Sequence, residues 1–262
     1  MADAHSRWRA LACGAALVTV WLAAPAAAQR PPTIAAASDL NAALTEIAGH
    51  FQSEIGQRVD LVFGSSGTLT RQILDGAPFE MFLSADEAFV DTLTKAGRTR
   101  DGGALYAVGR IALFAPAGSP LDPAGGLDAL RRLLDAGQVR RFAIANPEHA
   151  PYGRAAEAAL KKHGLRTTLQ PHLVLGDNVS QAAQFATTGN AVGGLIAYSQ
   201  VLAPEFAGRG AHAVIPDADY PPLRQAMVRL KGASPVANAF VDYVRQAAAR
   251  AILRRHGFGV PD

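Results

Sequence analysis

The sequence predicts an α/β protein built from two lobes. Short apolar runs typical of strands alternate with segments whose apolar residues recur every three or four positions, as in helices. A longer strand-like run at 106–115 divides this alternation into two halves, and the chain returns with two more strand-like runs near its end. The order predicts that residues 29–110 and 217–262 form lobe 1 and that residues 111–216 form lobe 2. Each lobe is expected to have a mostly parallel sheet with flanking helices, with the ligand site in the cleft between them.

The first 28 residues have the composition of a signal peptide. Two arginines near the N-terminus precede an apolar run from Leu11 to Ala24, and three alanines at 26–28 match a cleavage site. The apolar run is shorter than the roughly 20 residues that a membrane-spanning helix needs. We therefore expect residues 1–28 to direct export and to be removed. The single cysteine, Cys13, would be lost with them, which excludes disulfides and Cys-based metal sites from the mature protein.

Lobe 1 shows three repeats of a strand followed by a helix. The apolar run from Thr33 to Ala37 precedes Ser38, a preferred N-cap residue, and a periodic segment from Leu40 to Ile55. Ser38 is therefore expected to cap the first helix. The other strands are expected at 58–63 and 79–86, and the other helices at 69–76 and 87–97.

Lobe 2 continues the same alternation. Its strands are expected at 141–145, 173–175 and 192–197, and its helices at 127–136, 154–163 and 179–188. The run at 106–115 is expected to be one strand that crosses between the lobes, and strands at 212–216 and 226–230 provide the return. Residues 235–256 have the periodicity of one long amphipathic helix.

Composition and motifs argue against several classes of function. The net charge is only +3, and the basic residues are scattered among acidic ones, so nucleic acid is not an expected partner. The chain has no Gly-Lys dipeptide and hence no P-loop, no G-x-G-x-x-G motif that opens a helix, and no H-E-x-x-H pair. We therefore predict no catalytic residues, no protein ligands to a metal and no cofactor.

Four expected helix starts carry groups that can bind an anion. They lie at Ser38, Ser66, Tyr152–Gly153 and Val179, each after an expected strand. The first N–H groups of a helix have no partner within the helix and lie at the positive end of its dipole, so they attract anions. Each start alone is most simply a capped helix. Four of them around one cleft would form a site made of neutral N–H and O–H donors.

The order of several short motifs resembles that of the periplasmic molybdate-binding proteins of ABC importers. The resemblance extends over essentially the whole chain after the signal peptide and implies a periplasmic-binding-protein-like fold with two lobes and a hinge. Its carriers are Ala35–Leu40 (AAASDL), Phe63–Leu69 (FGSSGTL), Gln72-Ile73 with Gly76–Pro78, Phe82–Asp86 (FLSAD), Asn146–Gly153 (NPEHAPYG), Asn178–Ala182 (NVSQA) and Gly257-Phe258.

The resemblance implies roles for individual residues. Ser38 and Ser66 match the two serines that bind the oxyanion through a hydroxyl and a backbone N–H, and Tyr152 and Val179 match positions that donate a main-chain N–H. In some members a tyrosine hydroxyl after the last strand of the second lobe completes the site. Here the nearest tyrosine, Tyr198, lies one position later. The fifth donor is expected to be the hydroxyl of Tyr198 or, as the alternative, that of Tyr152.

The resemblance also implies the function. We expect a monomeric periplasmic protein, not an enzyme, that binds molybdate or tungstate and delivers it to an ABC permease in the inner membrane. Lobe closure about the strands near 106–115 and 226–230 would seal the site. Two alternatives stay open, namely a receptor for another small anion such as sulfate or phosphonate, and a hydrolase or transferase that uses Ser66 with His149.

Overall fold

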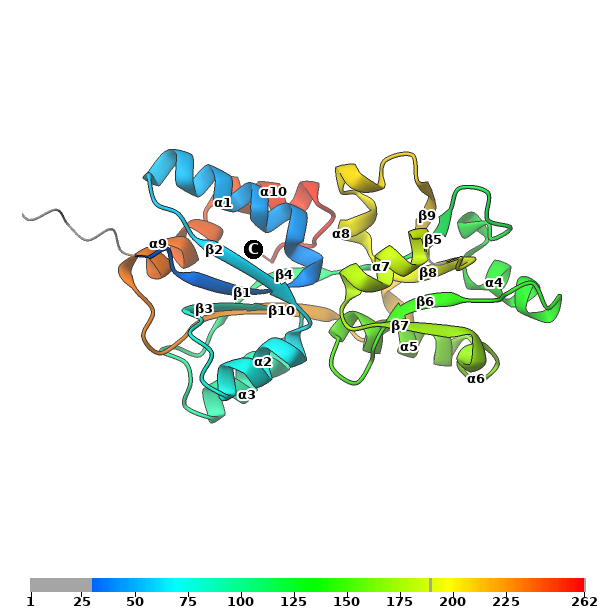
Figure 1. The fold of residues 1–262 in the computed structure, drawn as a ribbon, viewed down its shortest axis with the longest axis horizontal. Coiled ribbons are helices and arrows are strands. Elements are labelled where there is room, and N and C mark those ends of the chain that lie inside the picture. Colours follow the sequence, from blue (N-terminus) through cyan, green and yellow to red (C-terminus); the bar gives the residue numbers. More distant parts are fainter. Residues whose placement is uncertain (1–29, 189, 262) are drawn as a thin grey trace, which may run out of the picture. The chain divides into compact units, whose positions relative to one another are not determined.

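Two five-stranded sheets, each flanked by helices, organise the chain (Figure 1). The computed structural model describes residues 30–188 and 190–261, so the expected signal peptide at 1–28 lies outside the described residues. The strands of the first sheet come from residues 33–109 and 223–229, and those of the second come from residues 111–214. The predicted fold class of two α/β lobes is confirmed. We refer to the part around the first sheet as lobe 1 and to the part around the second as lobe 2.

Lobe 1 contains a mixed sheet with the order β2-β1-β3-β10-β4. Strand β1 is parallel to β2 and β3, so these three strands end at the same edge, whereas β10 is antiparallel to β3 and β4. The strands are β1 (Thr33–Ala37), β2 (Asp60–Gly64), β3 (Met81–Ser84), β4 (Ala104–Gly109) and β10 (Leu223–Arg229). The helices are η1 (Ser38–Leu40), α1 (Asn41–Ile55), α2 (Ser66–Leu74), α3 (Glu87–Lys95), α9 (Pro235–Val244) and α10 (Ala247–Arg255).

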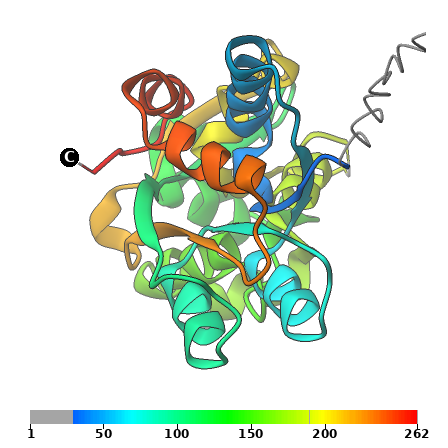
Figure 2. The ribbon, with the colours of Figure 1, turned by 90° about the vertical axis from the view of Figure 1, so that its left-hand side faces the viewer.

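Helices cover both faces of the lobe 1 sheet. Helices α1, α9 and α10 lie on one face, and α2 and α3 lie on the other (Figure 2). Successive residues of β1 therefore enter different clusters: Ile34 packs in the cluster that contains Phe51, whereas Ala35 packs in the cluster that contains Leu69. A strand buried on both faces explains why the sequence from Thr33 to Ala37 lacks polar alternation.

Lobe 2 contains a second mixed sheet with the order β7-β6-β8-β5-β9. Strand β6 is parallel to β7 and β8, whereas β5 is antiparallel to β8 and β9, which repeats the pattern of lobe 1. The strands are β5 (Ile111–Pro116), β6 (Phe142–Ala145), β7 (Leu173–Gly176), β8 (Gly193–Ala197) and β9 (Gly210–Val214). The helices are η2 (Pro123–Gly125), α4 (Gly126–Asp135), α5 (Pro151–Lys162), α6 (Arg166–Leu169), η3 (Gln170–His172), α7 (Val179–Thr188), α8 (Tyr198–Val201) and η4 (Pro204–Phe206). Helix η5 (Asp217–Asp219) lies in the connection from β9 to β10 of the first sheet.

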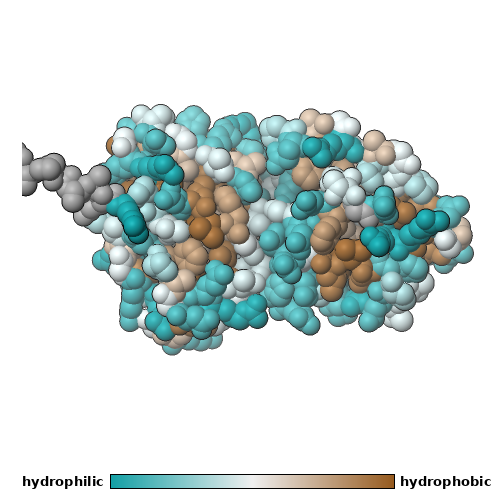
Figure 3. Space-filling model, viewed as in Figure 1, coloured by the Kyte–Doolittle hydropathy of each residue, from teal (hydrophilic) through white to brown (hydrophobic). Residues whose placement is uncertain are grey.

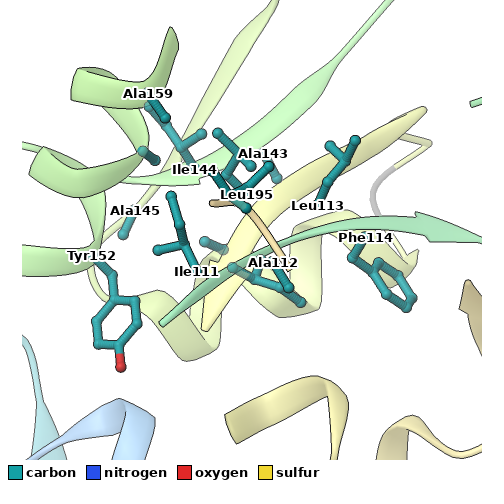
Figure 4. Packing of buried hydrophobic residues seen from close by; sticks show 14 of the residues in the cluster. Ile111, Ala112, Leu113, Phe114, Ala143, Ile144, Ala145, Tyr152, Ala159 and Leu195 are labelled. Atoms are coloured by element: carbon teal, nitrogen blue, oxygen red, sulfur yellow. The ribbon is translucent and has the colours of Figure 1, made fainter. Parts of the chain in front are cut away.

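The core of lobe 2 is built from its central strands and from α5. Ile111, Leu113, Ile144 and Leu195 are fully or almost fully buried and meet between the strands and the helices (Figure 4). Tyr152 of α5 belongs to the same cluster, and its hydroxyl points away from these apolar side chains. The cluster therefore holds the start of α5 in a fixed position at the edge of the lobe.

Two of the expected elements are each divided in the structure. The run at 106–115 is two strands, because β4 ends at Gly109 and β5 begins at Ile111, and they belong to different sheets. The single helix expected at 235–256 is α9 followed by α10, and Gln246 between them has an extended backbone with φ −70° and ψ 156°. The break lets Phe240 of α9 and Ile252 of α10 enter the same buried cluster.

Apolar side chains are also exposed on the two edge strands. Hydrophobic areas lie over β2 and over β7 on the face shown in Figure 3, where Val62 is 38% exposed and Leu175 is 46% exposed.

Among the residues that the structure describes, no helix is both long enough and apolar enough to cross a membrane.

Candidate anion-binding site

A small cavity lies where the ends of β1, β2 and β3 meet the helix starts of lobe 2. Its volume is about 10 Å³, which is about enough for one water molecule. Any larger ligand therefore requires the walls to move apart. Its lining comes from both lobes and consists of Ala37, Ser38, Asp39, Gly64, Ser65, Ser66, Ala85, Ala150, Pro151, Tyr152 and Val179. The structure thus brings together four of the five predicted site residues and leaves Tyr198 outside the lining.

The four predicted residues in the lining, Ser38, Ser66, Tyr152 and Val179, all lie at the beginning of helices. Ser66 is the first residue of α2, Val179 is the first of α7, Tyr152 is the second of α5, and Ser38 is the first of η1, which leads into α1. Their side chains are almost completely buried. N–H groups at these positions have no partner within their own helix. The cavity is therefore lined by backbone donors at the positive ends of several helices.

The prediction that Ser38 caps the first helix is wrong. Ala37 occupies the N-cap position before η1 with an extended backbone and no capping side chain. Helix α2 is capped by Ser65, whose Oγ accepts a hydrogen bond of 3.2 Å from the Thr68 N–H. Capping thus does not occupy the hydroxyls of Ser38 and Ser66, and both remain available to the cavity.

The two serine hydroxyls are arranged as donors. Ser66 Oγ accepts a hydrogen bond of 3.0 Å from the Ala85 N–H, so its own proton is free to point elsewhere. Ser38 Oγ makes no hydrogen bond in the part of the chain that the structure describes, although Ser38 is only 4% exposed. Both hydroxyl protons can therefore reach an acceptor placed in the cavity.

The hydroxyl of Tyr152 is engaged in the wall of the site. It donates to Asp39 Oδ2 over 2.9 Å and accepts from Gln225 Nε2 over 3.2 Å. Burial raises the pKa of Tyr152 well above its ordinary value, and the nearby Asp39 carboxylate adds to this effect. Tyr152 thus keeps its proton for Asp39, and the group that it can offer a ligand is its backbone N–H.

Tyr198 has a structural environment of its own. Its ring lies against His212, with ring centroids 5.9 Å apart, and a Cβ on Gly257 would lie 2.7 Å from the ring. Its backbone N–H donates to the Arg110 carbonyl. Tyr198 begins α8, one position after the end of β8, and alternation along an extended chain sends neighbouring side chains in opposite directions. The Tyr152 hydroxyl is thus bonded to the wall of the cavity, and Tyr198 is not among the residues that line it.

Asp39 is a buried acid in the wall that the sequence reasoning did not select. Its carboxyl is 2% exposed, and Oδ2 accepts hydrogen bonds from Tyr152 and, over 2.7 Å, from Gln225 Nε2. Burial raises the pKa of Asp39 to about 6, and the hydrogen bonds from Gln225, Tyr152 and the Asp39 backbone partly oppose the increase. Tyr106 orients the amide of Gln225 by donating to its Oε1 over 2.6 Å. The only local signal was the position of Asp39 immediately after Ser38.

Hydrogen bonds between the lobes hold the cavity closed. Ser199 Oγ of lobe 2 donates to the Asp39 carbonyl over 2.8 Å, and Ser180 Oγ donates to the Ser38 carbonyl over 3.1 Å. From lobe 1, the Gly67 N–H donates to the carbonyl of His149 over 3.0 Å. These bonds and the Tyr152–Asp39 bond involve the same short segments that line the cavity, so closure and ligand contact are coupled.

An ion pair joins the lobes near the rim of the site. Arg154 of α5 lies 2.6 Å from Asp86 Oδ2, and the guanidinium also stacks over the ring of Phe89 at 5.1 Å. Asp86 caps α3 by accepting from the Ala88 N–H. Since both charged side chains are about one-third exposed, water screens the pair and its contribution is small.

The arrangement of serine and histidine does not assemble a nucleophile. His149 Nδ1 lies 3.0 Å from Oγ of Ser65, not of Ser66, and Ser65 also donates to Thr68 Oγ1. Within the described chain, the ring of His149 has no carboxylate partner that would orient it as a general base. Likewise, no group of three or more His, Cys, Asp or Glu side chains in the described ranges is placed to hold a metal ion.

Two α/β lobes that close over a cavity lined by helix starts have the architecture of a solute-binding protein. The family model for bacterial extracellular solute-binding proteins matches residues 32–259, and the chain belongs to this family. The match covers both lobes.

Relatives within the family are similar over most of their length. The molybdate-binding protein ModA of Rhodobacter capsulatus is 38% identical over 95% of this chain and 96% of its own, and ModA of Azotobacter vinelandii is 36% identical over 87% and 89%. The solved structure of the Azotobacter vinelandii periplasmic molybdate-binding protein superimposes with a TM-score of 0.79 at 31% identity, covering 88% of this chain and all of that one. The sulfate-binding protein SubI of Mycobacterium tuberculosis, at 17% identity and a TM-score of 0.71, shares the fold.

Proposed function

We propose that this protein captures molybdate or tungstate and delivers it to an ABC permease of the inner membrane. The observation that carries the proposal is the closed cavity lined by the starts of α2, α5 and α7 and by the Ser38 and Ser66 hydroxyls. Preorganised N–H and O–H donors bind an oxyanion without a charged partner. The molybdate-binding relatives, similar over nearly the whole chain, support the choice of ion.

In this proposal the donors are two hydroxyls and the backbone N–H groups of Ser38, Ser66, Tyr152 and Val179. A dianion without a proton suits such a site, because every oxygen can accept. Phosphate retains a proton near neutral pH, and an O–H placed against N–H groups would lack an acceptor, at a cost of about 1–3 kcal/mol. Sulfate also has no proton, so discrimination between sulfate and the larger molybdate depends on how far the walls separate on binding.

The transport cycle would rest on movement of the two lobes. We propose that residues 29–110 with 217–262 and residues 111–216 move as lobes about the segments near Arg110 and between β9 and β10. Opening would break the hydrogen bonds between Gly67 and His149 and between Tyr152 and Asp39, which is how a larger ion could enter. The closed form would then present both lobes to the permease. In this scheme residues 1–28 direct export, and the mature protein acts in the periplasm as a monomer without catalytic activity or a cofactor.

Isothermal titration of the protein lacking residues 1–28 tests the proposal. Molybdate and tungstate are expected to bind at one site, sulfate more weakly, and phosphate least. Ser66→Ala should weaken molybdate binding about tenfold or more, because a hydrogen bond to a charged group contributes about 1.5–3 kcal/mol. Ser53→Ala is the matched control, since this hydroxyl lies on the exposed side of α1 and donates to the His50 carbonyl. Tight binding of sulfate or phosphate without binding of molybdate would overturn the choice of ion.

A further inference from the structure

Asp39 has side-chain hydrogen-bond donors at only one of its two carboxyl oxygens. Oδ2 accepts from two donors, Tyr152 from lobe 2 and Gln225 from lobe 1. Oδ1 is fully buried and has no hydrogen-bond partner among the described residues. A carboxylate would leave this charged oxygen without a donor, whereas a carboxylic acid with its proton on Oδ1 would lack only an acceptor.

The groups that face Asp39 supply no positive charge. Tyr106 from β4 and Tyr152 from α5 are the ionisable side chains close to it, and burial raises the pKa of both well above the ordinary value, so both are uncharged near neutral pH. Gln225 from β10 is neutral, and Ser199 from α8 bonds only to the Asp39 carbonyl. A negative charge on the Asp39 carboxyl would therefore be compensated by hydrogen bonds and by the start of η1, in whose first turn Asp39 lies, and by no cationic side chain among these groups.

Two other titratable or charged environments border the acid. Asp39 also contributes to a larger cavity of about 320 Å³ on its other side, where the charged side chains are Glu205 and Arg209. Tyr220 lies behind Tyr152, and burial raises its pKa to about 12. On the side of the candidate anion site, the ring of His149 contacts Ser65.

We propose that Asp39 is protonated when the closed site holds a dianion, so that each captured ion brings one proton with it. The inference rests on the proposed function. Asp39 lines the same cavity as Ser38 and Ser66, so an ionised carboxylate there would repel the ligand at short range. Protonation removes that repulsion and supplies an O–H in place of a lone pair. The proton comes from the solvent during closure and returns to it when the lobes open, where water solvates the carboxylate again.

Titration calorimetry in buffers of different ionisation enthalpy measures this proton directly. Molybdate is titrated into the protein lacking residues 1–28 at about pH 7.5, and the slope of observed heat against buffer enthalpy gives the protons taken up. We expect close to one proton per ion, and a dissociation constant that weakens about tenfold per pH unit above neutrality. Asp39→Asn, which fixes the neutral form, should take up no proton and bind with little dependence on pH.

His149→Asn is the matched control, because His149 is the imidazole that contacts the cavity wall, at Ser65. It should retain the proton uptake of the unmodified protein. Uptake that is lost in His149→Asn, or kept in Asp39→Asn, would overturn the assignment to Asp39, and tight binding with no uptake would overturn the inference itself. Failure of molybdate and tungstate to bind at all would instead overturn the proposed function. If Asp39→Asn did not fold, the unmodified protein and His149→Asn together would still decide the question.

Discussion

Replacing Tyr152 by Phe removes one oxygen from the contact between the two lobes. That oxygen donates to Asp39 Oδ2 over 2.9 Å and accepts from Gln225 over 3.2 Å. If Asp39 is neutral in the ligand-bound form, as proposed, both are hydrogen bonds between neutral groups, and each contributes about 0.5–1.5 kcal/mol. Because these bonds exist only when the lobes are closed, their loss acts on the equilibrium between open and closed forms. Each 1.4 kcal/mol is a factor of ten, so we expect molybdate to bind about 10- to 100-fold more weakly.

Calorimetry gives the dissociation constant of this variant, and small-angle scattering with and without molybdate gives the extent of closure. The thermal midpoint in the absence of ligand should change by less than about 3 °C, because neither lobe loses a core contact. Tyr243→Phe is the matched control, since it removes the same atom from α9 inside lobe 1. If Tyr152→Phe bound molybdate within twofold of the unmodified protein, the hydroxyl would not contribute to closure and the coupling argued here would be refuted.

Three further changes act on closure or on the buried acid. A Cβ at Gly67 would lie 2.7 Å from the His149 carbonyl oxygen, so Gly67→Ala should weaken molybdate binding more than about tenfold. Small-angle scattering should then show less compaction of the protein when molybdate is added, and normal compaction would contradict this. Arg154→Ala removes the screened ion pair with Asp86, so molybdate binding should weaken up to about fivefold at low salt. Titrations at two ionic strengths should show that the variant and the unmodified protein bind equally well at high salt. The folded-state pKa of Asp39 is raised to about 6 from an ordinary 3.8, which destabilises the folded protein above pH 6 by up to about 3 kcal/mol and not below pH 4. Asp39→Asn should therefore raise the thermal midpoint more at pH 8 than at pH 5, and equal gains at both would count against the shift.

Local sequence carried enough information to locate the helix starts. The change from an uninterrupted apolar run to a three-and-four spacing at Ser38 marked where β1 gives way to η1 and α1. The same reasoning found Ser66 and Val179, which are the first residues of α2 and α7. These features depend on backbone hydrogen bonding and on burial of one face, both of which are set within a few residues.

Features that depend on which partner a residue meets were predicted less well. The run from 106 to 115 is apolar except for Arg110, and pairing with different sheets divides it at that residue. His149, from the loop that precedes α5 in lobe 2, meets Ser65 at the N-cap of α2 and not Ser66, and this contact between lobes cannot be seen in the local sequence. Tyr198 stands at the expected place in the chain, but its ring packs on His212, outside the lining of the cavity.

The sequence by itself determined the two-lobe α/β fold and four of the residues that line the cavity. The periodicity of strands and helices and the positions of helix starts depend on residues that are close together in the chain. Only the tertiary structure decided the environment of Asp39, which in the sequence is simply an acidic residue after Ser38. Its partners, Tyr152 and Gln225, lie 113 and 186 positions away in the chain. The contact between the lobes brings them to one carboxyl oxygen and buries the other, and that desolvation is what raises the pKa of Asp39.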